Sequence, residues 1–437
     1  METTRGARVL DACDRFGILA AIQKLQDRRA HMIIGAIGHG FWPLVGGLER
    51  QIQDCAIGWV RRDCQVRVLS IVGEGSRLPK REKMPVRAAH TSPGNRRAAL
   101  QAIDVLRSPV LRPSVPHDPL SEPEIPSQVY RDLVPTWAQE LADVDVLVTF
   151  GASPAIAGGL LKARLGLPLI AVLPGIPEVG DRRFDEVRRC DADVFVTVSR
   201  CMRDRARRLF DLHSLTIYNG IDTAFFRPVR PRSLKATEHL PGPLITAPVR
   251  LDPAKDVELL IEAFDILHAL RPDATLLVTG NGSICHDLGL ANPYYEHLRQ
   301  LVALKDLSHS VRFARGSIAA SDMPSLYSRS DVCVMASRTE GFGLALAESL
   351  ACGTPVVATR TEGMAEVFAD GAGGVFVDSR EPADIAQCLL TLIGDDHLRR
   401  RMGATGRRHV QRAFPVQQQA DRYLELLQSL NTCRRAA

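Results

Sequence analysis

The sequence predicts an α/β protein with two doubly wound, parallel-sheet domains that face each other across a cleft. A chain of 437 residues is too long for one ordinary core and fits two domains of roughly 200 residues each. Short apolar runs alternate with helical or loop segments in both halves, as they do around parallel sheets. A segment rich in proline and charge, 227–243, separates the halves and predicts a linker.

The first half, 31–226, carries six predicted strands, most of them followed by a helix or a loop. They are the apolar runs 31–38, 65–73, 145–150, 168–174, 194–199 and 214–220. A polar stretch, 74–127, interrupts the series. Its five prolines between positions 113 and 126 cannot join a strand ladder, so we expect an extended loop there. Residues 1–30 are predicted to form an amphipathic helical extension.

The second half, 244–414, repeats the alternation of strands and helices. Its predicted strands are 244–249, 274–282, 310–316, 331–337, 354–359 and 373–377. These runs are almost continuously apolar, as expected when helices cover both faces of a sheet. The last segment, 415–437, is predicted to be helical.

Composition excludes several classes of protein. Hydrophobic residues make up 45% and charged residues 24% of the chain, which excludes a disordered protein. A net charge of +5 is small for this length and gives no reason to expect nucleic acid as a partner. The ten cysteines form no C-x-x-C pair, so we expect free thiols in a reducing compartment.

Hydropathy predicts a cytoplasmic chain that does not cross a membrane. No apolar run reaches 18 residues, and the N-terminus lacks the apolar core of a secretion signal. Two basic runs, 200–210 and 399–410, leave two interpretations open. They are solvated helix faces, or they attach the protein to an anionic membrane surface.

The motif with the most chemical content is ASRTEGFGLALAESLACGTPVVAT. An apolar strand leads into a loop with Glu340, Phe342 and Gly343, and the following helix begins near Leu344 and contains Glu348. Open α/β sheets bind ligands beyond the carboxyl ends of their strands. Small residues there let backbone amides approach an anion at a helix N-terminus. Each carboxylate can accept two hydrogen bonds from the hydroxyls of a sugar or a ribose.

Two further motifs suit a phosphate-bearing ligand. VRLDPAKDVELLIEAF has Arg250 at the end of a strand and Lys255 in the loop that follows. Two cations at this spacing can converge on a diphosphate. Gly46 and Gly47 lie between the first strand and a helix, where backbone amides can bind a phosphate or an acceptor.

Together these motifs resemble those of glycosyltransferase family 4 (group 1). Glu340 and Glu348 match the E-x7-E signature, in which the first acid contacts the donor sugar and the second contacts the ribose. Arg250 and Lys255 match an R-x4-K pair that neutralises the donor phosphates. Supporting matches are a P-x-x-G-G-x-E pattern and several loop residues: Pro43, Gly46, Gly47 and Glu49, the segment 218–228, Gly280 and Gly282, and Gly363 with Glu366.

The resemblance covers nearly the whole chain from about residue 31. It implies the GT-B fold, in which two Rossmann-like domains face each other and the second holds the nucleotide diphosphate sugar. It implies that 415–437 packs back on the first domain. It also implies a retaining hexosyl transfer that needs no metal and no cofactor besides the donor. We expect a lipid-linked acceptor or a polysaccharide precursor, because 74–127 is longer than a plain connection needs.

The first half departs from the family pattern where many relatives have two histidines. One follows the third predicted strand and the other ends the fourth, and this chain has Phe150 and Pro174 there. The nearest substitutes for a catalytic group are His39, in the G-H-G after the first strand, and His117. A lone histidine is more often structural, so both interpretations of each residue stay open.

The two D-x-D strings are interpreted as structural. In other glycosyltransferases such a string binds a metal together with the nucleotide. Asp143–Asp145 and Asp191–Asp193 lie just before apolar strands, where aspartate commonly ends a helix or turn. No cluster of histidine and cysteine suggests a site either, so no metal site is predicted.

Two other functions compete with glycosyl transfer. A nucleotide-sugar epimerase can use the same two-domain fold, although the context of E-x7-E argues against it. A nucleotide-sugar-binding protein without catalysis is the second, and the missing histidines of the first half allow it.

Overall fold

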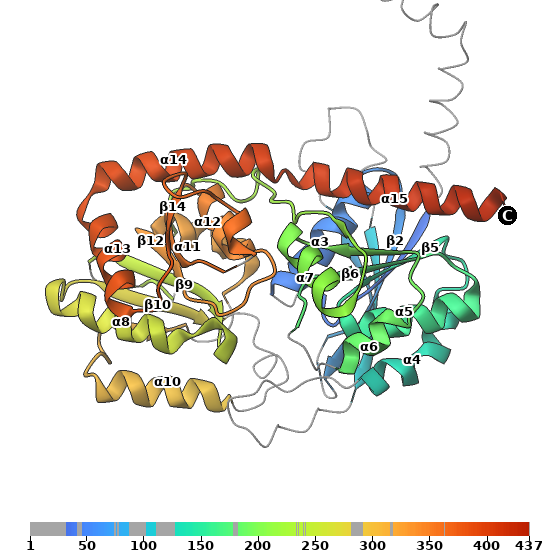
Figure 1. Cartoon of the computed structure of the whole chain (residues 1–437), viewed down its shortest axis with the longest axis horizontal. Coiled ribbons are helices and arrows are strands. Elements are labelled where there is room, and N and C mark those ends of the chain that lie inside the picture. The colour runs from blue at the N-terminus through green and yellow to red at the C-terminus, as the bar shows by residue number, and fades with distance from the viewer. Residues whose placement is uncertain are drawn as a thin grey trace, which may run out of the picture.

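The computed structural model shows two α/β domains side by side, with two long helices running along both (Figure 1). The first domain contains β1 to β8 and the second contains β9 to β14. The structure describes residues 32–41, 46–73, 76, 78–86, 102–110, 127–177, 182–232, 234, 236–238, 240, 242–280, 292–314, 318–361 and 363–436.

The first domain is built on an eight-stranded sheet of order β3-β4-β2-β1-β5-β6-β7-β8. Every neighbouring pair is parallel except β3 and β4. β5 and β6 are buried at every residue, as expected for strands covered on both faces. The strands are β1 (Ile33–Ile37), β2 (Gln65–Gly73), β3 (Arg81–Pro85), β4 (Ala102–Val110), β5 (Val146–Phe150), β6 (Leu169–Leu173), β7 (Val194–Thr197) and β8 (Leu215–Thr216).

The stretch 74–127, predicted to be an extended loop, contains β3 and β4, so that prediction was wrong. The first six residues of β4 alternate between half-buried and buried, a period of two that its charged residues concealed. The Arg107 side chain is fully buried, and it donates to the Pro79 carbonyl at 2.9 Å and to the Glu82 carboxylate at 3.0 Å. The prolines between positions 113 and 126 lie outside the described residues.

Helices cover both faces of the first sheet. Trp59 of α3 packs in one core cluster with Val146 and Val148 of β5, whereas Trp137 of α4 packs in another with Leu147. Successive residues of the same strand therefore point into two different cores. The helices described in this domain are α3 (Gly47–Val60), α4 (Ser127–Glu140), α5 (Ala152–Leu165), α6 (Arg182–Arg188) and α7 (Arg200–Phe210).

The second domain has a six-stranded, fully parallel sheet of order β11-β10-β9-β12-β13-β14. Its strands are β9 (Leu244–Arg250), β10 (Thr275–Gly280), β11 (Val311–Phe313), β12 (Val332–Met335), β13 (Val356–Thr359) and β14 (Gly374–Val377). The helices described here are α8 (Val257–Leu270), α10 (Pro293–Leu304), α11 (Met323–Arg329), α12 (Leu344–Ala351), α13 (Pro382–Gly394) and α14 (Asp396–Ala413).

Each sheet has one central strand at which the strand order switches direction. The chain moves outward from β1 through β2 in one direction and through β5 in the other, and β9 lies in the same way between β10 and β12. Parallel sheets bind ligands at the carboxyl ends of such neighbouring strands. The loops after β1, β5, β9 and β12 are therefore the places to examine.

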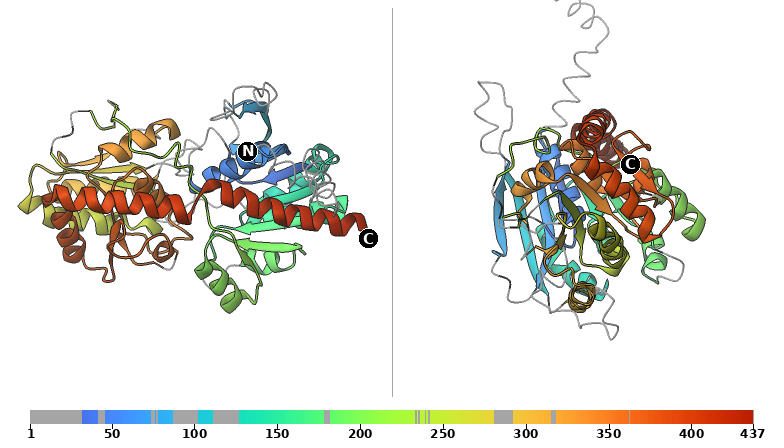
Figure 2. Two further views of the ribbon diagram at one scale, coloured as in Figure 1. Left: turned by 90° about the horizontal axis from the view of Figure 1, so that it is seen from above. Right: turned by 90° about the vertical axis from the view of Figure 1, so that its left-hand side faces the viewer.

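The chain crosses between the domains twice, and the two crossings lie against each other. The amide of Ile221 donates to the Phe414 carbonyl at 2.7 Å, and the Gly220 amide donates to the Gln419 side chain at 2.9 Å. Beyond this point α15 (Val416–Ala436) runs along α3 of the first domain (Figure 2, left). Its Tyr423 ring packs edge-on against Trp59. No helix in the described ranges is both long and apolar enough to span a bilayer.

Three aspartates secure the beginnings of the strands, at the edge away from these loops. Asp145 accepts from the Ile33 amide at 2.8 Å, and Asp193 accepts from the Leu169 amide at 2.7 Å. In the second domain, Asp331 accepts from the amide that begins β9 at 2.8 Å. These contacts support the structural interpretation of both D-x-D strings.

Candidate functional site

The carboxyl ends of β9 and β12 carry two cations and a carboxylate. Arg250 is the last residue of β9, and Lys255 ends the one-turn helix η2 (Pro253–Lys255) that follows. Glu340 lies in the loop after β12, and its carboxylate accepts a 2.7 Å hydrogen bond from the Lys255 ammonium. Arg250 pairs with Asp252 at 3.0 Å. Both predicted cations thus have a carboxylate partner from their own domain.

The turn that carries Lys255 is fixed by two aspartates. Asp252 precedes the turn and accepts from its backbone at 2.8 Å. Asp256 follows it with a φ of 47° and a buried side chain. That carboxylate pairs with Arg338 at 3.1 Å and with Arg380. Sequence reasoning missed this buried carboxylate with its two guanidinium partners, because its members are far apart in the chain.

The loop after Glu340 needs glycine at two places for different reasons. Gly343 begins α12 with a φ of 98°, a conformation that side chains rarely adopt. Gly341 packs against the carbonyl of Pro174 in the first domain, so closely that a Cβ atom would overlap the oxygen. The second contact shows that residues 340–343 touch the first domain directly. These residues are called the donor loop below, after the role that the sequence predicts for them.

Phe342 lies in a buried aromatic cluster. Its ring centroid is 6.1 Å from that of Tyr218 and 5.2 Å from that of Phe414, and 2% of the residue is exposed. The side chain therefore packs against the crossing between the domains. A part for Phe342 in substrate binding stays a prediction.

Two helix N-termini, one from each domain, approach each other near the donor loop. Gly47 is the first residue of α3, and a Cβ atom on it would lie 3.7 Å from the Leu344 side chain at the start of α12. Gly46 precedes α3 in an extended conformation. The dipoles of these two helices favour an anion here, and in this structure the Glu49 carboxylate lies against Gly46 at the start of α3.

Glu348 lies deeper in α12 and contacts different partners from Glu340. The Tyr327 hydroxyl donates to its carboxylate at 3.0 Å, and Arg50 of α3 approaches it at 3.8 Å. Burial raises the pKa of Glu348, and Arg50 and Tyr327 act against that rise. The two glutamates of the E-x7-E spacing thus occupy separate environments.

Arg50 approaches a predicted site residue, and sequence reasoning missed it. Its guanidinium lies over the Phe226 ring at 4.9 Å to the centroid and faces Glu348 across the domains. Burial raises the pKa of Asp54, one turn further along α3, to about 7, although Arg50 lowers it. The signal was present in the G-G-L-E-R sequence, because a residue in the first turn of α3 points toward the same place as Gly46 and Gly47.

On the first-domain side, His39 follows β1 at the switch in strand order. Its Nδ1 contacts the Tyr130 hydroxyl, and the two rings meet edge-on at 5.3 Å. Burial lowers the pKa of His39 to about 4, and the nearby charge of Arg183 adds to the shift. The imidazole is therefore neutral at physiological pH.

His39 also approaches the end of β5. A Cβ atom on Gly151, which has a φ of 109°, would lie 3.4 Å from its Nε2. Phe150 is fully buried in the core, and the carbonyl of Pro174 faces Gly341. The imidazole thus lies beside the end of β5, next to the first of the two places where relatives have a histidine.

The remaining predicted residues fall into two groups. Gly280 ends β10 with a φ of 66° and pairs with Arg250, and Gly363 packs directly on the backbone of Glu340 and Gly341. Both therefore border the donor loop or the strand end beside it. Three others lie outside the described residues: Pro43, His117 and Gly282.

Neither a metal site nor a large pocket is found at this place in the described part of the chain. In the part of the chain that the structure describes, no three His, Cys, Asp or Glu side chains are grouped as a metal site requires. A groove of about 680 Å³ lies between α5, α6 and the end of α15, near the beginnings of β6 and β7. It is on the opposite side of the first sheet from the loops described above.

Two family models match the chain in succession. The model described as Glycosyltransferase Family 4 matches residues 45–225, and the model described as Glycosyl transferases group 1 matches residues 234–409. One model therefore lies on each domain, and the gap between them falls in the predicted linker.

Characterised relatives match over parts of their length. A GDP-mannose-dependent monoacylated alpha-(1-6)-phosphatidylinositol monomannoside mannosyltransferase of Corynebacterium glutamicum is 31% identical, over 55% of this chain and 63% of its own. A related mannosyltransferase of Mycolicibacterium smegmatis is 29% identical, over 67% and 79%. A D-inositol 3-phosphate glycosyltransferase of Salinispora arenicola is 31% identical, over 58% and 61%. The chain thus spans about three fifths to four fifths of these relatives.

Solved structures match over nearly the whole chain. Sucrose-phosphate synthase from Thermosynechococcus elongatus has a TM-score of 0.73 at 19% identity, over 92% of this chain and 100% of its own. HepE of Anabaena, solved with UDP and glucose, has a TM-score of 0.69 at 18% identity, over 91% and 100%. These likenesses show the fold, which is GT-B as predicted.

Proposed function

Since this chain belongs to the group 1 glycosyltransferases of family 4, we propose that it transfers a sugar from a nucleotide diphosphate sugar to an acceptor hydroxyl, with retention at the anomeric carbon. The observation that carries the proposal is the Lys255–Glu340 pair at the switch point of the second sheet, with Arg250 at the end of β9 five residues before Lys255. This is where an open α/β sheet binds a nucleotide, and the charges suit a diphosphate attached to a sugar.

Donor binding would replace contacts that the protein makes with itself. Lys255 pairs with Glu340 at 2.7 Å, and a donor phosphate offers that ammonium a stronger anionic partner. Glu340, released from the lysine, can then accept hydrogen bonds from the sugar hydroxyls. Glu348, with Tyr327 beside it, would accept from the ribose hydroxyls.

Catalysis would consist mainly of stabilising the leaving group. The bond between the anomeric carbon and the phosphate oxygen breaks, the acceptor oxygen bonds to the same face of that carbon, and the acceptor proton passes to the departing phosphate. Negative charge grows on the diphosphate during this step. Arg250, Lys255 and the amides at the start of α12 would stabilise it. No step in this scheme needs a metal.

The relatives guide the choice of acceptor. Their names describe GDP-mannose-dependent transfer to phosphatidylinositol monomannosides and transfer to inositol 3-phosphate. We therefore propose a lipid-linked acceptor or a saccharide precursor, bound on the first-domain side near His39. We also propose that the reaction takes place in the cytoplasm at the inner face of an anionic membrane. The exposed arginines of α7, three of which pair with carboxylates, would contact its surface.

A ligand panel followed by a product assay tests the proposal. Thermal unfolding with UDP-, GDP- and ADP-sugars should identify the donor, since a ligand at 100 times its Kd stabilises a protein by about 2.7 kcal/mol. The donor is then incubated with and without acceptor, in EDTA and in magnesium. Transfer in EDTA supports the proposal. A new nucleotide sugar formed without acceptor would identify an epimerase. Binding of the donor without any product would identify a non-catalytic protein. Activity that is restored only by magnesium would identify a metal-dependent enzyme.

A further inference from the structure

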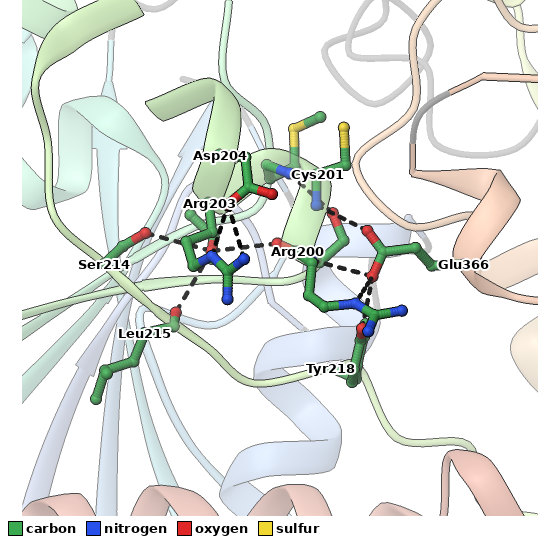
Figure 3. Close-up of polar contacts among 11 residues, drawn as sticks. Arg200, Cys201, Arg203, Asp204, Ser214, Leu215, Tyr218 and Glu366 are labelled. Carbon is green, nitrogen blue, oxygen red and sulfur yellow. Dashed lines mark hydrogen bonds and ion pairs between the residues drawn. The ribbon is translucent and has the colours of Figure 1, made fainter. Parts of the chain in front are cut away.

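A carboxylate from the second domain lies at the N-terminus of helix α7 of the first domain. Glu366 ends the one-turn helix η4 (Met364–Glu366) of the second domain, and its side chain points across the interface (Figure 3). It accepts from the Cys201 amide at 2.7 Å and from the Arg200 amide at 3.1 Å. The first amides of a helix have no partner within it, so Glu366 supplies what α7 lacks.

The N-terminus of α7 is therefore capped jointly by two domains. Ser199, the residue before the helix, accepts from the Met202 amide at 3.2 Å in the usual manner. The same hydroxyl donates to the carbonyl of Gly341 in the donor loop at 2.8 Å. Two separate contacts thus tie the start of α7 to the second domain.

A tyrosine completes the site around Glu366. The Tyr218 hydroxyl donates to the carboxylate at 2.5 Å, and burial together with Glu366 raises the pKa of Tyr218 to about 12. Burial favours the neutral acid, but hydrogen bonds from Tyr218 and the two amides outweigh it and lower the pKa of Glu366. The carboxylate is ionised and the phenol protonated at neutral pH.

The contacts with Glu366 contribute unequally to the stability of the domain interface. Arg200 also lies 3.2 Å from the carboxylate, but its side chain is 66% exposed, so this ion pair adds little. The carboxylate itself is 12% exposed, and hydrogen bonds to a charged group away from water are the stronger kind. The two amides and the phenol are therefore the contacts that hold the domains together here.

The donor loop lies directly against this cap. Gly363, at the start of η4, packs on the backbone of Glu340 and Gly341 so closely that a Cβ atom would overlap it. The Tyr218 ring packs on Phe342 of the same loop. A movement of Glu366 relative to α7 would therefore move the loop that carries Glu340 relative to the first domain.

We propose that Glu366 is a positioning residue, which caps α7 from the opposite domain and thereby holds the donor loop at the place where a bound acceptor can reach the sugar. Tyr218 orients the carboxylate for this task. The inference rests on the proposed function, because it assumes that the donor binds to the second domain and the acceptor to the first.

The test compares Glu366→Gln and Tyr218→Phe with Glu258→Gln. In the control pair, Tyr294 donates to Glu258 entirely within the second domain, so the variant loses the same kind of charged acceptor without affecting the interface. For each variant we would measure the affinity for nucleoside diphosphate alone, kcat and KM with donor and acceptor, and the radius of gyration by small-angle scattering.

Glu366→Gln should bind the bare nucleotide with unchanged affinity, because every proposed nucleotide contact of the second domain remains. Its kcat should fall by up to about 100-fold, as expected when reacting groups are displaced by about 1 Å. The radius of gyration should rise. Tyr218→Phe should show a smaller loss in the same direction, and Glu366→Asp should recover part of the kcat. Glu258→Gln should behave as the wild type.

The outcomes separate this inference from the proposed function. An unchanged kcat and an unchanged radius of gyration in Glu366→Gln would overturn the positioning role. Equal losses of nucleotide affinity and kcat would also overturn it, since Glu366 would then act on the donor or on stability. If the wild type binds nucleotide but transfers no sugar, the proposed function fails, whereas the scattering comparison still decides whether Glu366 sets the domain arrangement.

Discussion

The two sheet edges that face each other in this protein are built in different ways. The edge of the second domain is charged, and its cations are paired with carboxylates of the same domain, such as Lys255 with Glu340 at 2.7 Å. The edge of the first domain presents a neutral histidine, His39, a glycine at the end of β5 and the carbonyl of Pro174, and its charged groups, Arg50 and Arg183, lie beside these. The difference fits a donor with a diphosphate on one side and an uncharged hydroxyl as the attacking group on the other.

The largest expected effect is on the charged edge. Changing Arg250 and Lys255 together to alanine should weaken the binding of nucleoside diphosphate by about 100- to 10,000-fold, because hydrogen bonds to charged groups are worth roughly 1.5–3 kcal/mol each. Isothermal calorimetry measures this. The control is Lys305→Ala, which removes a lysine of the same domain that pairs with Glu262 and Asp265. Equal affinities in all three proteins would contradict the assignment of the diphosphate site.

The two glutamates test whether the charged edge has a division of labour. Glu340→Gln should lower turnover by about 10- to 100-fold and leave the affinity for bare nucleoside diphosphate nearly unchanged, since Glu340 would act on the sugar during transfer. Glu348→Gln should weaken bare nucleotide and full donor alike, because both carry the ribose. The measurements are calorimetric affinity and turnover at saturating donor. The division is wrong if Glu340→Gln loses as much bare-nucleotide affinity as Glu348→Gln.

The two edges touch at Gly341, where glycine is needed because of the lack of space for a side chain and not because of its backbone conformation. Gly341→Ala adds one methyl group that overlaps the Pro174 carbonyl, so the domains must separate slightly. Turnover should fall by roughly 10-fold while the affinity for bare nucleotide is kept. Gly394→Ala is the matched control, because a Cβ atom there meets nothing within 4 Å. Full activity of Gly341→Ala would show that this close approach is not needed for transfer.

The same contrast explains how much could be predicted from the sequence. The family and the GT-B fold were predicted, because apolar strands alternate regularly with helices and the E-x7-E and R-x4-K spacings are short. The R-x4-K spacing lies within one strand end and the turn after it, so it fixes where Arg250 and Lys255 lie relative to each other. The sequence did not show that Lys255 meets Glu340, which is 85 positions away. Their roles in binding stay predictions.

The contacts that the sequence could not predict join residues distant in the chain. Tyr130 and His39 are 91 positions apart and meet only because α4 packs beside β1. Arg50 reaches Glu348 from the other domain, and Glu366 reaches the start of α7 in the same way. The strand β4 was missed because Arg107 and its charged neighbours resemble a polar loop until Glu82 and the Pro79 carbonyl are found beside that arginine.

The smallest expected effect concerns the neutral edge, where the pH dependence of stability reports on His39. Burial lowers its pKa to about 4 in the folded protein, whereas an unfolded histidine titrates near 6.5. The depressed pKa means that the contribution of His39 to stability is complete above pH 6.5 and is lost as the pH falls toward 4. By pH 5 the loss amounts to at most about 2 kcal/mol.

The wild-type curve alone cannot isolate this effect, because Asp54 acts in the opposite sense. Its pKa is raised to about 7, so its protonated form stabilises the fold as the pH falls through the same window. The measured quantity is therefore the Tm of His39→Gln minus that of the wild type. Glutamine keeps a polar partner for the Tyr130 hydroxyl and cannot be protonated, so this difference should rise by a few degrees between pH 7 and pH 5. The control variant is His309→Gln, which replaces an exposed histidine of the second domain. A flat difference for His39→Gln would mean that the imidazole is open to solvent, and the neutral edge would then carry a titratable group near the acceptor.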